Sequence, residues 1–157
     1  MLKQGNGDFK YYVGIGSLAQ VATRADRVCV LNILGGESSD VTPVGHAYSG
    51  GNVVFGTSPG RRGQALETPL GDVPVYNNVR EGLEAGHSFN CGVVYLPPSA
   101  ARDGVAELIR VNPDLRKVFI VTEKMSVLLD LPPMMNSTLV CLSQCLKQMR
   151  ATSRIFS

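Results

Sequence analysis

Apolar and β-branched residues gather in four nearly continuous runs along this chain, each closed by glycine or proline or by a polar residue. Such runs are typical of strands that are buried on both faces of a parallel sheet. A shorter run at 73–76 contains Pro74, which cannot donate to a ladder, so we expect this strand to lie away from the sheet centre. The four long runs are 27–34, 52–56, 91–96 and 117–122.

Helical patterns separate these strands. The first candidate, over 40–49, is weak because a proline and a glycine interrupt it. Asn78 can cap a second helix over 79–85. Ser99 is expected to cap a third helix, whose apolar positions keep helical spacing as far as the asparagine before Pro113.

A C-terminal helix is expected after residue 136, because the apolar positions there also keep helical spacing. Asn136 or Ser137 would cap this helix, and Cys141 and Cys145 would lie on it. Its apolar face would comprise Leu139, Leu142, Leu146 and Met149.

The alternation of strand and helix predicts right-handed crossovers and an α/β fold. We therefore expect a Rossmann-like, doubly wound and mostly parallel sheet over residues 27–157. Residues 1–26 are glycine-rich at the front and carry three aromatic side chains, which indicates an N-terminal extension or arm.

Length and charge narrow the possible functions. The chain has 157 residues, enough for one domain with one core. Its net charge of +2 gives no basis for expecting a nucleic-acid partner. No apolar run approaches the roughly 20 residues of a membrane span, so no transmembrane segment is expected.

Cysteine and histidine usage points to a reducing compartment. Cys29 and Cys91 fall inside expected strands and are interpreted as buried, reduced thiols. His46 and His87 stand alone, so no metal site is predicted. Because no secretory signal is visible, we expect the mitochondrial matrix or otherwise the cytoplasm.

Ligands of doubly wound sheets bind at the carboxyl ends of the strands. In this chain those ends correspond to the segments 35–39, 57–63, 95–99 and 122–124.

Four motifs at or near these ends carry a family resemblance. The first is G-T-S-P-G-R-R-G at 56–63 and the second is P-V-Y-N-N-V-R-E at 74–81. Y-L-P-P at 95–98 and V-T-E at 121–123 follow in the same order. Together they resemble the CoA-binding domain of the succinyl-CoA synthetase (succinate–CoA ligase) alpha subunit family over about residues 27–157.

The resemblance implies coenzyme A as the cofactor and assigns binding positions to this chain. Arg61 stands where the family has a lysine facing the CoA phosphates, and Arg62 replaces a glycine. The proline pair at 97–98 offers a flat apolar wall for the adenine, while Asn77 either binds a ligand or shapes a turn. The implied positions are Gly36, Ser38, Ser39, Ser58, Pro59, Arg61, Asn77, Leu96, Pro97 and Glu123.

The first loop departs from the family pattern. Only Gly36 matches its glycines, and Glu37 brings a carboxylate into the expected anion site, where it would repel phosphate. Lys124 replaces the glycine that follows the family glutamate. We therefore expect weakened CoA binding.

Three roles remain open. The family's phosphohistidine lies in a second domain, and this chain stops at Ser157, where that domain would begin, so we expect no complete ligase and no catalytic residue here. The chain is either a CoA-binding domain, as part of a larger or split ligase with other protein subunits or as a standalone CoA sensor, or an inactive descendant serving as a structural subunit of a large assembly such as a mitochondrial complex. A dinucleotide-binding regulator related to redox-sensing Rossmann proteins is the third.

Overall fold

The structure is a computed structural model that describes residues 23–122 and 138–141, the latter by their backbone. Its elements are β1 (Val28–Leu31), α2 (Gly36–Ser49), β2 (Val53–Thr57), β3 (Ala65–Leu66), β4 (Val73–Tyr76), α3 (Val79–Glu84), β5 (Cys91–Val94), α4 (Pro98–Val111), β6 (Lys117–Ile120) and β7 (Thr138–Cys141).

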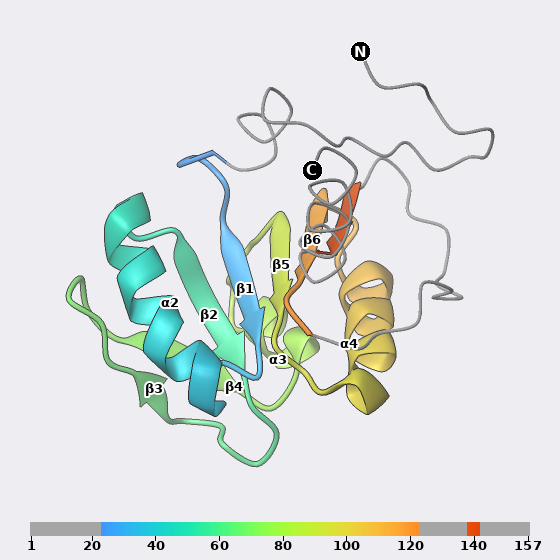
Figure 1. Cartoon of the computed structure of the whole chain (residues 1–157), viewed down its shortest axis with the longest axis horizontal. Helices are drawn as coiled ribbons and strands as arrows, with labels where there is room; N and C mark the ends of the chain where they lie inside the picture. Colours follow the sequence, from blue (N-terminus) through green and yellow to red (C-terminus); the bar gives the residue numbers. More distant parts are fainter. Residues whose placement is uncertain (1–22, 123–137, 142–157) are drawn as a thin grey trace, which may run out of the picture.

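The seven strands form one sheet in the order β3-β4-β2-β1-β5-β6-β7. Every neighbouring pair is parallel except β3 and β4. The chain leaves β1 on one side toward β2 and returns on its other side at β5 (Figure 1). This reversal beside β1 confirms the predicted doubly wound, Rossmann-like fold.

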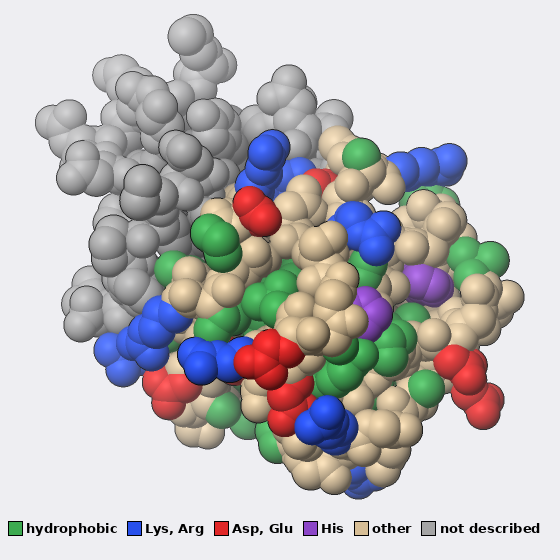
Figure 2. All heavy atoms as spheres, turned by 180° about the vertical axis from the view of Figure 1, so that it is seen from behind, with side chains coloured by type: hydrophobic (Ala, Val, Ile, Leu, Met, Phe, Trp, Pro, Cys, Tyr) green, Lys and Arg blue, Asp and Glu red, His purple; other side chains and the backbone are tan. Residues whose placement is uncertain are grey.

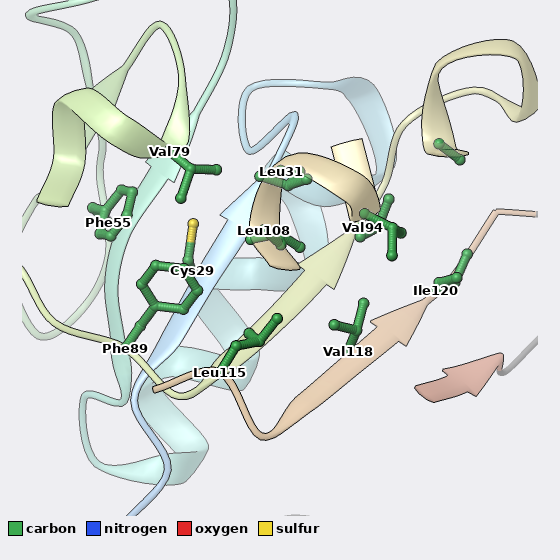
Figure 3. Packing of buried hydrophobic residues seen from close by; sticks show 12 residues of the cluster. Cys29, Leu31, Phe55, Val79, Phe89, Val94, Leu108, Leu115, Val118 and Ile120 are labelled. Carbon is green, nitrogen blue, oxygen red and sulfur yellow. The ribbon is translucent and has the colours of Figure 1, made fainter. Parts of the chain in front are cut away.

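The core lies on both faces of this sheet. Side chains of α3 and α4 pack with β1, β2, β5 and β6 into one cluster, which Figure 3 shows from close by. A second cluster lies on the other face and is built from alternate positions of β1, β2 and β5 together with residues of β3 and β4. Cys29 and Cys91 are buried thiols, as predicted, and burial raises the pKa of Cys91 to about 12.

Helix α2 differs from the usual amphipathic pattern. Its buried residues are Ser38, Thr42 and His46, whereas Val44 is 70% exposed and Tyr48 is 83% exposed. The helix therefore turns polar side chains inward and apolar ones outward. It also begins at Gly36, four residues before the expected start, and continues through Pro43.

Two further expectations need correction. Pro97, not Ser99, is the N-cap of α4, because Pro98 fits the first helical position, where the backbone N–H has no helical partner. Residues 138–141 form a strand beside β6 and not the start of a helix, so Cys141 lies on a strand. Short apolar runs fit either period, and the exposed edge of β6 supplies the ladder.

Within the described ranges, no helix combines the length and apolarity that a bilayer crossing requires.

Candidate functional site

The carboxyl ends of the parallel strands are joined by backbone hydrogen bonds into one continuous edge, which we call the carboxyl rim (32–39, 58–64, 77–78, 95–98 and 121–122). Ile33 N–H donates to the Thr57 carbonyl at 3.0 Å, joining the ends of β1 and β2. Ser58 N–H likewise donates to the last carbonyl of β4 at 2.9 Å. As far as residue 122, the segments that were predicted to converge lie along this rim.

Asn32 joins the β1 and β5 ends of the rim. It adopts a left-handed backbone with φ of 62°, and its Nδ2 donates to the Tyr95 carbonyl at 3.2 Å. Its own carbonyl accepts from Gly35 N–H at 2.9 Å. A Cβ at Gly35 would lie 2.5 Å from Asn32 Nδ2, so this glycine is required by close approach. Sequence reasoning missed Asn32, although a lone asparagine inside the apolar run 27–34 is a visible signal.

The first loop uses its serines internally. The buried Ser38 hydroxyl donates to the Asn32 carbonyl and also lies 3.2 Å from the Gly35 carbonyl, and Ser39 Oγ donates to the Gly36 carbonyl at 2.9 Å. Each hydroxyl has one hydrogen, so these donors are already committed to the backbone. Gly36 is exposed at the start of α2, and no side chain caps that helix.

The second loop holds Arg61 at the surface. Ser58 is buried, and its Oγ accepts from Leu34 N–H at 3.2 Å, which ties this loop to the first. Pro59 and Arg61 are exposed, and Arg61 Nη1 donates to Gln64 Oε1 at 3.4 Å. The Arg61 guanidinium is therefore held beside its own loop and faces solvent.

Asn77 fixes the turn of this second loop. Its Oδ1 accepts from Gly60 N–H at 3.0 Å, and Gly60 has a left-handed φ of 76°. Its backbone N–H and its Nδ2 donate to the two carboxylate oxygens of Glu81, at 3.1 and 3.2 Å. Arg62 Nε lies 3.8 Å from the same carboxylate. Asn77 therefore shapes a turn at the rim, one of its two expected roles.

The third loop contributes Leu96 and Pro97. Leu96 is half-buried, and a Cβ at Gly104 would overlap its side chain, so Leu96 packs closely against α4. The Leu96 carbonyl accepts from the Thr122 hydroxyl, which joins the β5 and β6 ends. Pro97 is exposed at the start of α4. Glu123, the last expected site residue, and Lys124 lie outside the described residues.

The side chains that would have blocked the rim point elsewhere. Glu37 is exposed and not buried in a pocket. Phe55 is fully buried in the core under α3, where its ring meets those of Tyr76 and His87. Burial and, after it, the charge of Glu37 raise the pKa of Tyr95, so the Glu37 charge acts toward the end of β5.

Charges are mixed over the surface seen from behind. Lys and Arg side chains are interspersed with Asp and Glu there, and no broad area of the described residues visible on this face carries one sign (Figure 2). Local placement, in particular that of Arg61 and Arg62, therefore decides where an anion would be attracted. A separate cavity of about 230 Å³ lies under α2, lined mainly by apolar side chains including Val30, Val93 and Phe119.

Comparison with known proteins agrees with this geometry. A family model described as a CoA binding domain matches residues 43–124, more than half of the chain. The match includes the second loop, Asn77 and Pro97, whereas the first loop precedes it. The match thus covers every described segment of the carboxyl rim except the first loop.

Two curated relatives and two crystal structures illustrate the likeness. The ADP-forming sulfoacetate-CoA ligase subunit SqwL of an Acholeplasma species is 30% identical over 101 residues, covering 64% of this chain and 31% of the relative. The ADP-forming succinate–CoA ligase alpha subunit of Staphylococcus epidermidis is 39% identical over 79 residues, covering 50% and 24%. The chain thus spans about a third or less of the length of these relatives.

The structural neighbours include RSP, a Rex-family repressor, in complex with β-NAD⁺ and operator DNA. Its TM-score is 0.58 at 16% identity, over 83% of this chain and 56% of that one. The complex of RSP with β-NADH has the same TM-score at 14% identity, over 88% and 63%. At such identities the likeness shows a common fold alone. By its family match and its fold, the chain belongs to the family of CoA-binding domains.

Proposed function

We propose that this chain binds coenzyme A at the carboxyl rim, as the CoA-binding part of an acid–CoA ligase of the succinate–CoA ligase type. One observation carries the proposal: Arg61 is exposed on a turn that the Gly60–Asn77 hydrogen bond fixes. Coenzyme A carries several phosphate groups, and a guanidinium binds phosphate through parallel N–H donors. A turn held in place presents that fork without a further ordering cost.

Neighbouring groups support the same ligand. Arg62 adds a second positive charge to the loop, although Glu81 lies 3.8 Å from it. The 14-residue helix α2 begins at the rim with exposed backbone at Gly36, and the positive end of a helix dipole attracts anions. Glu37 opposes this attraction, but its exposure lets water and salt screen the repulsion. The exposed Pro97 and Pro98 offer an apolar surface to the adenine ring.

Catalysis is assigned to other parts of the ligase. His46 Nδ1 accepts from Val53 N–H at 3.0 Å, and His87 Nε2 lies 2.9 Å from the Tyr76 hydroxyl. Both imidazoles of the chain are therefore engaged in structural contacts away from the rim. We propose that this domain supplies CoA binding, and that the phosphoryl-transfer and acid-activating groups come from other subunits or domains.

Calorimetric titration with coenzyme A tests the proposal. Arg61→Ala should weaken binding about tenfold or more, because it removes a charge-assisted contact. Arg116→Ala is the matched control, since this exposed arginine directly precedes β6 and so lies at the amino ends of the parallel strands, opposite the carboxyl rim. Absence of binding by the wild-type chain at millimolar coenzyme A would reject the proposal, as would equal losses in the two variants.

A structural subunit of a large assembly is the second candidate function, with the mitochondrial matrix as its proposed location. The observation that favours it is the outward apolar face of α2, formed by Val41, Val44 and Tyr48, which are 49%, 70% and 83% exposed. Exposed apolar surface of this kind is a common feature of protein contacts. Light scattering of the chain isolated from cells, together with cell fractionation, would test it. A chain that is recovered as a free monomer, or is absent from mitochondria, contradicts it.

A further inference from the structure

Glu81 occupies an unusual position relative to the rim. It lies in the first turn of α3, and its backbone N–H donates to the capping side chain of Asn78 at 2.9 Å. Its carboxylate is directed the other way, toward Asn77, and its side chain is only 22% exposed. Capping of α3 alone would not require the contact between the Glu81 carboxylate and Asn77 Nδ2.

The chemistry of the carboxylate decides how the Asn77 amide is oriented. An ionised carboxylate can only accept hydrogen bonds, so it pairs with the NH₂ end of the amide and not with the carbonyl end. The amide carbonyl is thereby turned outward, where it accepts from Gly60 N–H at 3.0 Å. If the Asn77 amide were rotated by 180°, Nδ2 would face Gly60 N–H, which is itself a donor, and Gly60 N–H would lose its acceptor.

The consequence reaches the arginine loop. Gly60 lies between Pro59 and Arg61 and has a left-handed φ of 76°, which fixes the direction of the turn. Arg61 N–H donates to the Ser58 carbonyl at 3.0 Å, completing this turn. A second route runs through Arg62, whose Nε lies 3.8 Å from Glu81.

We infer that Glu81 is a positioning residue of the CoA site, acting through Asn77 to hold the 58–63 turn and so to present Arg61 to the ligand. This inference rests on the proposed function for its ligand, whereas the positioning itself is a property of the free chain. In this proposal Glu81 does not contact the ligand, because its carboxylate faces Asn77 and would repel the phosphates of coenzyme A.

The matched variants are Glu81→Gln and Glu84→Gln. Both remove one negative charge from α3, but Glu84 is exposed at the last residue of the helix. In Glu81→Gln an NH₂ group replaces one of the two oxygens and must face one of the two Asn77 donors, so one of the two contacts is lost and Asn77 is held less firmly. Amide hydrogen exchange at Gly60 should become about three- to tenfold faster in Glu81→Gln and stay unchanged in Glu84→Gln.

The Ala85 amide separates positioning from a general loss of structure. Ala85 N–H donates to the Glu81 carbonyl at 3.0 Å and reports whether α3 is intact. Its exchange rate should not change in Glu81→Gln. Unchanged exchange at Gly60, or equal acceleration at Gly60 and Ala85, overturns the inference.

Calorimetry then connects the turn to the ligand. Glu81→Gln should weaken coenzyme A binding about three- to tenfold in the wild-type background and by much less in the Arg61→Ala background. Additive losses would show that Glu81 acts independently of Arg61 and would overturn the inference. If the wild-type chain binds no coenzyme A, the proposed function fails, and exchange at Gly60 still decides whether Glu81 holds the turn.

Discussion

Replacing Gly82 by alanine sets helix propensity against packing. Gly82 is buried on α3 and faces the ring of Phe55. A Cβ at this position would overlap Phe55 Cε2 and lie 2.6 Å from Cδ2 and Cζ, whereas real Cβ atoms almost never have contacts under 3.0 Å. The ring has little room to retreat. Its centroid lies 5.7, 5.4 and 5.5 Å from those of Tyr76, His87 and Phe89.

The two effects differ in sign and size. Alanine is favoured over glycine inside a helix by about 1 kcal/mol. Forcing an extra methyl group into a packed core costs about 1–3 kcal/mol, and the fully buried Phe55 places this site toward the upper part of that range. We therefore expect Gly82→Ala to lower the free energy of unfolding by about 1–2 kcal/mol. For a chain of this length that corresponds to a melting temperature lower by about 2–8 °C.

Urea unfolding followed by far-UV circular dichroism measures this difference. Gly45→Ala is the control, because Gly45 lies inside α2 and a Cβ there would meet nothing within 4 Å. This variant should gain about 0.5–1 kcal/mol from the backbone effect alone. If both alanine variants are stabilised, the Phe55 contact does not limit packing and the reasoning is wrong.

Three further predictions concern stability. His46 accepts from Val53 N–H, and burial lowers the pKa of His46 from 6.5, so the unfolded chain takes up the proton first as the pH falls. The His46 contribution to the free energy of unfolding should therefore be full above pH 6.5 and decrease below it. A His46→Gln variant that keeps this part of the pH dependence would refute the assignment. Lys117→Met should cost about 2 kcal/mol at pH 7 because Lys117 Nζ lies 2.7 Å from the buried Asp26 carboxylate. Burial alone would raise the pKa of Asp26, but the hydrogen bonds to its carboxylate, first that from Lys117, outweigh burial and lower this pKa. Unfolding curves should therefore show that the destabilisation by Lys117→Met shrinks as the Asp26 carboxyl is protonated below pH 3.8. Asn32→Ala should lower the free energy of unfolding by about 1 kcal/mol more than Asn32→Gly in the same assay, because both variants lose the side chain but only alanine is strained at φ of 62°. Equal losses in the two variants would exclude backbone strain as the cause.

The strands were predictable because continuous β-branched runs fit a doubly buried sheet and little else. The strand at 138–141 was not, since a short apolar run has the same pattern in a helix, and only the free edge of β6 decides between them. Helix α2 was predicted four residues short because its inward face is polar. Ser38, Thr42 and His46 are buried there, and the Ser38 and His46 side chains form hydrogen bonds with the backbone, which hydrophobic periodicity does not register.

The candidate site was likewise predictable only in part. Motif order placed the loops on one rim correctly, because strand ends meet at one edge of a parallel sheet. It did not reveal which serines bond to their own backbone, since a hydroxyl at 38 or 39 looks the same in sequence whether it faces a ligand or a carbonyl. Nor did it reveal the role of Glu81, which depends on the orientation of the Asn77 amide.

The first and second loops therefore contribute unequally to any CoA site. In the first, Ser38 and Ser39 use their hydrogens on nearby carbonyls, and Glu37 adds an exposed negative charge. In the second loop, the hydrogen bond from Gly60 N–H to Asn77 Oδ1 holds the turn, and the Arg61 guanidinium lies at the surface. The family match covers the second loop and begins after the first.

This imbalance has a consequence for the affinity of the domain. If phosphate recognition falls mainly to the second loop, affinity depends on how firmly one turn is held rather than on several shared contacts. Loss of the Arg61 turn would then remove most of the binding, whereas substitutions at Ser38 or Ser39 would act through stability. The proposed role of Glu81 fits its place beside the rim: its carboxylate accepts from Asn77 and lies 3.8 Å from Arg62 Nε, so its charge is paired within the turn that would present Arg61.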